Sequence, residues 1–301
     1  MRGGKSLFII AFSLLAALSV APHSAFAALS LDGHANGGDD GAPFSGAGVT
    51  LTTTDANDVV VFEIFNENDG SNIPTTVSSV SDSAGLTWHL RTATTSPAMQ
   101  QYADEGVNAT DMEIWWAHAP AQLSSDTIVP TLSGTTDCIS YVAFGVNGAN
   151  TATPWDTNGS LPTIASSASG VSTPSVSGIS TAEANTMILG FMGTGSYGSD
   201  DDAAPFVDGS GYTSIDSSLF GACAFAASTF AEYELVSSAQ SNIPAELGAP
   251  LTSGDGWFMI GDAIQAASPP ATTGRVIRLV GGLRIVGGVR LGGTSPVSPG
   301  Y

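Results

Sequence analysis

The sequence predicts an all-β protein built as a duplicated antiparallel β-sandwich, and three observations support this prediction. Short runs rich in Val, Ile, Thr and aromatic residues alternate with Gly, Asn, Asp, Ser and Pro, which is typical of strands separated by turns. After residue 27, no stretch keeps apolar residues at helical spacing for three turns between start and stop signals. Four segments also recur in the same order in the two halves of the chain.

Seven strands are expected in the first half. Each is a short run of β-branched or aromatic residues with turn-forming residues on either side, so each has a start and a stop in the local sequence. In chain order, the expected strands are residues 48–54, 58–65, 76–83, 86–94, 112–119, 126–134 and 138–146.

The repeat covers most of the predicted body, residues 28–268. Its four pairs of similar segments are 52–62 with 180–190, 82–88 with 208–214, 112–121 with 231–240, and 140–149 with 258–267. The spacing falls from 128 to 126, 119 and 118 residues along these pairs. Four pairs in the same order predict a duplicated sandwich unit.

Two arrangements of the halves, about 28–160 and 175–268, are open. They either interleave in one jelly-roll-like sandwich or form two tandem immunoglobulin-like sandwiches. We favour the jelly roll, because neither half has the Cys–Trp–Cys pattern of an immunoglobulin domain. The Ser-, Gly- and Pro-rich segment 157–178 would be a linker between the halves or a crossover on the sandwich surface.

The first 27 residues are predicted to be a secretory signal peptide. Arg2 and Lys5 precede an apolar run, 7–20, and the small residues Ala25 and Ala27 satisfy the cleavage preference. The run is short for a membrane span, which needs about 20 residues, although an uncleaved anchor is the alternative. We therefore expect a secreted protein with no membrane span after signal cleavage.

The charge of the mature chain limits its partners. It keeps all 27 acidic residues and five of the seven basic ones, so its formal charge changes from −20 to −22. Nucleic-acid binding by the body is not expected, because phosphate contacts need clustered Lys and Arg. An acidic surface of this kind also repels anionic partners and keeps an exported protein soluble.

Cysteine and metal-ligating residues are few. Cys138 and Cys223 are the candidates for a disulfide in an exported protein, and two separately buried thiols are the alternative. No cofactor is expected, although two oxygen-rich loops would suit calcium. These loops contain Asp200, Asp201 and Asp202, and Asn66, Asn68 and Asp69. The three histidines of the mature chain, His34, His89 and His118, are scattered, so zinc is not expected.

A pair of carboxylates is the candidate for catalysis. Asp111 and Glu113 are two residues apart, so on a strand both side chains point to one face. Carboxylate pairs on a jelly roll can cleave glycans as acid and base. Glu232 and Glu234 repeat the spacing, however, which favours a solvated outer face with Ile114 turned inward. We therefore expect no enzymatic activity.

Two adjacent tryptophans, Trp115 and Trp116, are the candidate ligand-binding residues. Neighbours on a strand face opposite sides, so if one fills the core, the other is exposed or covered by a loop. An exposed Trp offers a flat surface on which a sugar ring can stack, whereas packing at a sheet edge is the structural alternative. We expect Trp88 and Trp257 in the core and Trp155 as a loop anchor.

The C-terminal segment, 269–301, is a Pro-rich joint followed by a basic, Gly-rich β tail. As a strand, it would place apolar and basic residues on opposite faces. The apolar face includes Ile277, Leu283 and Ile285, and the basic face includes Arg278, Arg284 and Arg290. We expect the tail to assemble with another copy or attach the protein to a surface, and the alternative is an unfixed chain end.

Several segments resemble a loosely defined group of uncharacterised β-sandwich proteins encoded by bacteria and tailed phages. The resemblance rests on "VSSVSDSAGLTWHLRT", "EIWWAHAP", "GANTATPWDTNG" and "GWFMIGDAIQA", and it covers most of residues 48–267. It implies a secreted or virion-surface structural role and identifies no catalytic residue.

We therefore expect a secreted, non-enzymatic binding or structural protein of the cell exterior. Its partner would be a glycan or a surface protein, so carbohydrate binding is the specific function considered. The alternatives are a virion protein, such as a phage tail, fibre or decoration protein, and a glycan-active jelly-roll enzyme.

Overall fold

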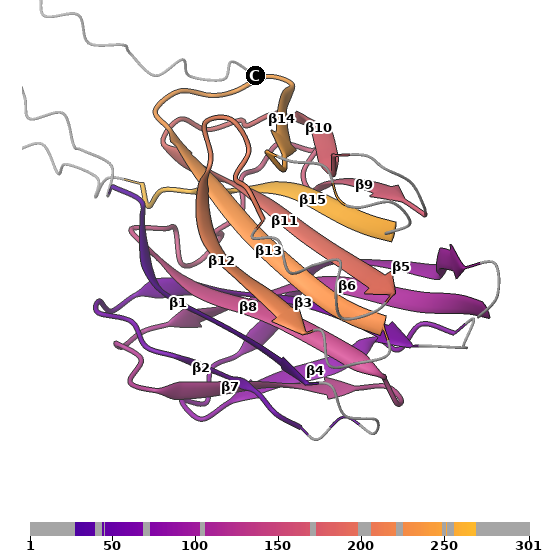
Figure 1. Cartoon of the computed structure of the whole chain (residues 1–301). Helices are drawn as coiled ribbons and strands as arrows, with labels where there is room; N and C mark the ends of the chain where they lie inside the picture. The colour runs from indigo at the N-terminus through magenta and orange to yellow at the C-terminus, as the bar shows by residue number, and fades with distance from the viewer. Residues whose placement is uncertain are drawn as a thin grey trace, which may run out of the picture. The chain divides into compact units, whose positions relative to one another are not determined.

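The structure is a computed structural model, and its described residues form 15 strands and no helix (Figure 1). It describes residues 28–39, 44, 46–68, 73–102, 106–168, 173–197, 206–220, 225–248, 251 and 256–268. The chain divides into residues 1–269 and 270–301, and every described residue belongs to the first unit. No helix among these residues is long and apolar enough to cross a membrane. The predicted signal peptide and the predicted tail lie outside the described residues.

All pairing is antiparallel, and each half of the chain contributes one large and one small sheet. In the first half, the large sheet has the order β1-β8-β3-β6-β5 and the small sheet has the order β2-β7-β4. The strands are β1 (Ser30–Asp39), β2 (Val49–Leu51), β3 (Asp58–Asn68), β4 (Val77–Asp82), β5 (Trp88–Tyr102), β6 (Gly106–Ala119), β7 (Asp126–Leu132) and β8 (Cys138–Asn147). The seven expected strands correspond to β2 through β8, and β1 was not expected.

The second half repeats this topology. Its large sheet, β9-β15-β11-β13-β12, follows the order of the first large sheet, and its small sheet pairs β10 with β14 as β2 pairs with β7. The strands are β9 (Thr163–Ser167), β10 (Ser175–Ile179), β11 (Thr186–Tyr197), β12 (Thr213–Phe220), β13 (Phe225–Val236), β14 (Ile243–Glu246) and β15 (Gly256–Gln265). The prediction of an all-β, duplicated sandwich is confirmed.

Equivalent turns show that the repeat extends to backbone conformation. Asn57 and Asn185, 128 residues apart, both have positive φ, at 65° and 57°. Gly85 and Gly211, 126 residues apart, also have positive φ, at 77° and 94°. Asn and Gly tolerate this left-handed region better than other residues do, so the first two repeated segments mark equivalent turns.

Two details of the repeat differ from the sequence expectation. Segment 157–178, expected as a linker or crossover, contains β9 and most of β10, so the second half starts near residue 163. The third pair of segments is also shifted by two residues. Trp116 lies opposite Val61 and Tyr233 lies opposite Leu189, which gives a spacing of 117 instead of 119.

The four sheets form layers around three apolar cores. A central core lies between the two large sheets and contains side chains from both halves, such as Phe144 and Phe191, whose ring centroids are 6.3 Å apart. A first outer core lies between the first large and small sheets, and a second outer core lies between the corresponding sheets of the second half. Each large sheet is therefore covered on both faces.

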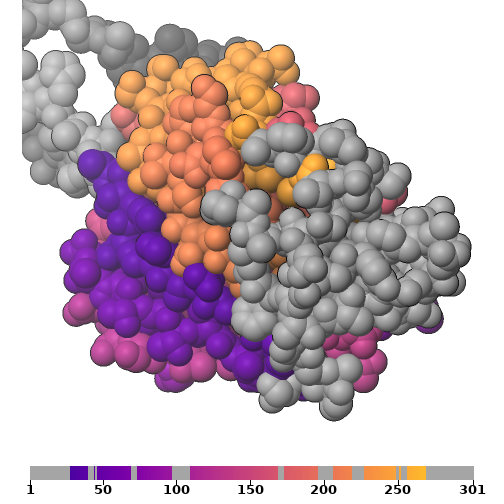
Figure 2. Space-filling model, viewed as in Figure 1, coloured from indigo at the N-terminus to yellow at the C-terminus, as the bar shows by residue number. Residues whose placement is uncertain are grey.

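The halves keep separate sheets but share the central core, and polar contacts join them at its edges. His34 and Asn36 on β1 contact the carboxylate of Asp216 on β12, each at 2.8 Å. On the surface shown in Figure 2, first-half atoms in indigo and second-half atoms in orange meet directly. The two sandwiches thus pack face to face and are not joined only by a linker.

Buried aspartates hold equivalent turns in the two halves. The carboxylate of Asp32 accepts hydrogen bonds from the backbone N–H groups of Thr54 and Asp55 and from the hydroxyl of Thr54, at 2.6–3.0 Å. In the second half, the carboxylate of Asp156 accepts from the N–H groups of Ala182 and Glu183, at 2.8 and 3.0 Å. These aspartates satisfy backbone donors that the tight turns leave without strand partners.

Candidate functional site

The two halves have the same topology, so a comparison of equivalent positions shows which residues the fold requires. The buried aspartates, the positive-φ turn residues and a β-bulge occur at equivalent places in both halves. The register shifts at Arg91 on β5 and at Ile215 on β12, between equivalent positions of the neighbouring strands. A side chain that differs between the halves, at a position open to solvent, is therefore a candidate for function.

Three such residues lie together on β5 and β6. His89 pairs with Trp116 across the two strands, and His118 follows Trp116 by two residues, so the three share a face. The strand pairing gives their second-half counterparts as Thr213, Tyr233 and Leu235, respectively. The second half thus keeps the fold without this His–Trp–His set.

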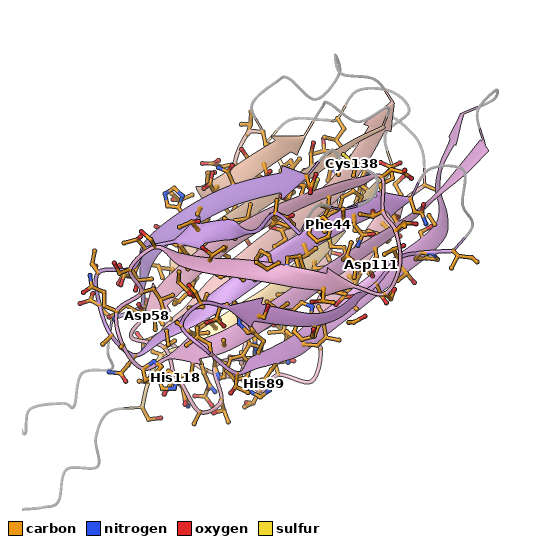
Figure 3. All side chains as sticks on the ribbon, turned by 90° about the horizontal axis from the view of Figure 1, so that it is seen from below. Phe44, Asp58, His89, Asp111, His118 and Cys138 are labelled. Carbon is orange, nitrogen blue, oxygen red and sulfur yellow. The ribbon has the colours of Figure 1, made fainter. Side chains whose placement is uncertain are left out.

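The three side chains line a pocket of about 430 Å³. The imidazole of His89 lies against the indole of Trp116, with ring centroids 4.8 Å apart and planes at 32°. The β4–β5 turn, the end of β6 and the segment after β8 complete the walls through Ala84, Gly85, Leu86, Thr87, Pro120, Thr151 and Ala152. Figure 3 labels His89 and His118 at this end of the first large sheet.

Trp115 and Trp116 face opposite sides of the first large sheet. Trp115 is 9% exposed in the first outer core, and its indole N–H donates a hydrogen bond of 2.7 Å to Glu113. Trp116 is half-buried, packs against the edge of the central core and lines the pocket. Of the two candidate binding residues, Trp116 is therefore the one placed to contact a ligand.

Asp111 and Glu113 do not lie on a solvated face, contrary to our interpretation of the repeated spacing. Their exposed fractions are 0% and 2%, and Glu232 in the second half is also buried. They point toward the first outer core, while Ile114 lies in the central core. Because sheets cover both faces of the large sheet, alternation along β6 separates two cores and does not separate core from solvent.

The carboxyl pair has structural partners. Glu113 accepts hydrogen bonds from the backbone N–H of Val77 and the indole N–H of Trp115, and Asp111 accepts one from Asn66, at 3.2 Å. Burial, together with the charge of Glu113, raises the pKa of Asp111 to about 9, so Asp111 holds a proton at neutral pH. The pair thus joins β6 to β3 and to the first small sheet.

The other tryptophans have structural contacts. The ring centroid of Trp155 lies 4.9 Å from the guanidinium of Arg91, which also donates hydrogen bonds to buried Asp262, at 2.8 and 3.1 Å. Trp155 is buried after β8 and bridges to Ile264 on β15, as a loop anchor would. Trp257 is buried in the second outer core, and Trp88 packs at the edge of the first.

Several of the candidate disulfide, calcium and tail residues lie outside the described residues. Cys138 is disulfide-bonded, whereas Cys223, the other cysteine of the chain, lies outside them. Other candidates outside are Asp69, Asp200, Asp201, Asp202, Ile277, Arg278, Leu283, Arg284, Ile285 and Arg290.

The remaining calcium candidates are described, and their side chains have protein partners. The amide of Asn66 donates to Asp111, and the amide of Asn68 donates to the carbonyl of Ile73, at 3.3 Å. Within the described part of the chain, no group of three or more His, Cys, Asp or Glu side chains is placed to hold a metal ion.

Sequence reasoning missed the two histidines of the pocket. His89 is 27 residues from Trp116 in the chain, and only the pairing of β5 with β6 brings the two together. The relation of Trp116 to His118 could have been found, because residues two apart on a strand share a face.

Comparisons with protein-family models, curated proteins and solved structures found no match to this chain. The function is therefore inferred from the pocket and from the contrast between the two halves.

Proposed function

We propose that this protein is a secreted, non-enzymatic β-sandwich protein that binds carbohydrate through the Trp116 pocket. The observation that carries the proposal is the placement of Trp116 in an open pocket, where the equivalent position of the second half has a tyrosine and no histidine neighbours. The C-terminal tail is proposed, from its sequence pattern, as an attachment or assembly element.

The pocket combines the groups that a sugar ring requires. An indole presents an apolar surface to the C–H face of a pyranose, and stacked aromatic contacts contribute beyond their buried area. The imidazoles of His89 and His118 and the hydroxyls of Thr87 and Thr151 can exchange hydrogen bonds with sugar hydroxyls. A volume of about 430 Å³ is within the usual range of ligand pockets.

The position of the carboxylates supports binding over hydrolysis. A glycosidase needs two carboxyl groups on either side of the scissile bond, where both contact the substrate. Asp111 and Glu113 are instead buried and bonded to neighbouring strands, away from the pocket residues.

Replacing Trp116 by Ala is expected to weaken glycan binding by about tenfold or more, because the stacking surface is lost; tenfold corresponds to about 1.4 kcal/mol. The measurement is a glycan array on the mature protein, followed by titration calorimetry with the best oligosaccharide. Tyr233→Ala is the matched control, since Tyr233 occupies the equivalent position and also packs against the central core.

Equal losses of affinity in the Trp116→Ala and Tyr233→Ala variants would contradict the proposal, because general loosening of the central core would then explain both. The Asp111→Asn variant should retain glycan binding. Release of reducing sugars by the wild type that disappears in this variant would favour the enzyme instead.

A further inference from the structure

Four side chains in the described part of the chain can carry positive charge, and two of them have acidic partners. Arg91 is the one Lys or Arg there, and its guanidinium is paired with Asp262. Of the three described histidines, His34 contacts Asp216 at 2.8 Å. His89 and His118 remain without a carboxylate partner among the described residues, and both line the pocket.

No Asp or Glu is among the described residues that line the pocket. Two carboxylates accept hydrogen bonds from the β4–β5 turn, which forms one wall of the pocket. Asp82 accepts from the backbone N–H of Leu86 and the indole N–H of Trp88, and Asp126 accepts from Ser83 and Ala84. The described lining of the pocket therefore contains imidazoles and no carboxylate, on a protein with a formal charge of −20.

His118 also has unused hydrogen-bonding capacity. The Nε2 atom of His118 is buried and has no hydrogen-bond partner among the described residues. An imidazole can donate to a carboxylate when neutral and does so more strongly when protonated, because the hydrogen bond is then charge-assisted.

We propose that the pocket binds an acidic sugar, a uronic acid residue whose ring stacks on Trp116 and whose carboxylate accepts hydrogen bonds from His89 and His118. This inference rests on the proposed carbohydrate-binding function and names the substrate class of the same site. The acidic body contributes to specificity. Its surface carboxylates repel an anionic sugar, but this repulsion is screened beyond about 8 Å at physiological salt. An anionic sugar is therefore disfavoured at the acidic surfaces and accepted at the pocket, where the side chains are imidazoles and not carboxylates.

The test compares pairs of trisaccharides that differ only in charge. Galacturonate, glucuronate and mannuronate trimers are titrated into the mature protein in mildly acidic buffer, each beside the same trimer after reduction of its carboxyl groups to alcohols. In at least one pair, we expect the acidic member to bind about tenfold or more tightly, as an added charge-assisted hydrogen bond predicts. A His89→Gln, His118→Gln double variant should lose this preference and bind the acidic and the neutral member of each pair with equal affinity.

His34→Gln is the control, because it removes a histidine outside the pocket and should leave the preference unchanged. Equal binding of acidic and neutral members by the wild type would overturn the acidic specificity and leave carbohydrate binding intact. A preference that survives in the folded double variant, checked by thermal unfolding, would place the carboxylate elsewhere and also overturn it. Binding of neither member in any pair would contradict carbohydrate binding of these sugars altogether.

Discussion

The free energy of unfolding is expected to fall by several kcal/mol as pH rises from about 4 to about 9, the reverse of an ordinary acid-denatured protein. The cause is a set of buried carboxyl groups in a body with almost no cations. Burial raises the pKa of Asp111 to about 9, of Glu232 to about 7 and of Asp58 to about 6. Burial also raises the pKa of Glu63 well above its ordinary value.

The direction follows from proton binding. Between the ordinary carboxyl pKa near 4 and the raised folded value, the unfolded chain has lost a proton that the folded protein keeps. Each such group therefore lowers stability by up to about 1.4 kcal/mol per pH unit, until pH passes its folded pKa. Asp32 acts in the opposite sense at lower pH. Burial raises its pKa, but hydrogen bonds from Thr54 and Asp55 outweigh this and lower it, so its contribution is lost in strong acid.

Urea unfolding followed by tryptophan fluorescence across this pH range measures the effect. Repulsion among the surface carboxylates also increases with pH, so a matched variant is needed to separate the two causes. Asp111→Asn removes a proton-holding group, and the variant should match the wild type near pH 4 to 5 and exceed it in stability near pH 9. A wild-type stability that rises with pH, or an Asp111→Asn profile parallel to that of the wild type, would refute the assignment to Asp111.

The second large effect is expected from Asp32→Ala, which should cost about 3 kcal/mol of unfolding free energy. The carboxylate of Asp32 is the acceptor for two backbone N–H groups and one hydroxyl in the turn that leads into β3. Removing it leaves these donors without their partner. Asp156→Ala should have a comparable effect in the second half, because Asp156 holds the equivalent turn.

Asp55→Ala is the control in the same turn, since the side chain of Asp55 is exposed, and a change within about 0.5 kcal/mol is expected. Urea midpoints of the three variants at a single pH provide the comparison. If Asp32→Ala changes stability no more than Asp55→Ala does, water replaces the carboxylate and the turn does not depend on it.

Much of the fold could be predicted because the signals are local. The runs 58–65 and 138–146 contain enough β-branched and aromatic residues to mark strands, and the residues around them mark the turns. The repeat was also visible, because equivalent turns need the same backbone conformation, as Asn57 and Asn185 show.

Strand β1 could not be predicted in this way. Its sequence, "SLDGHANGGD", is rich in glycine and contains no β-branched residue. It is a strand because β8 offers a sheet edge with which it pairs, and because glycine at position 33, where φ is 77°, allows the close approach of the Thr52 carbonyl. Both causes are contacts with residues that are distant in the chain.

The candidate site was also predictable only in part from local sequence. Local sequence was sufficient to show that Trp115 and Trp116 face opposite sides, and that Asp111 and Glu113 share a face, because side chains alternate along any strand. Sheet packing was needed to show what each face contacts. Since the first large sheet is covered on both sides, the carboxylates are buried, and the pairing of β5 with β6 places His89 beside Trp116 in the pocket.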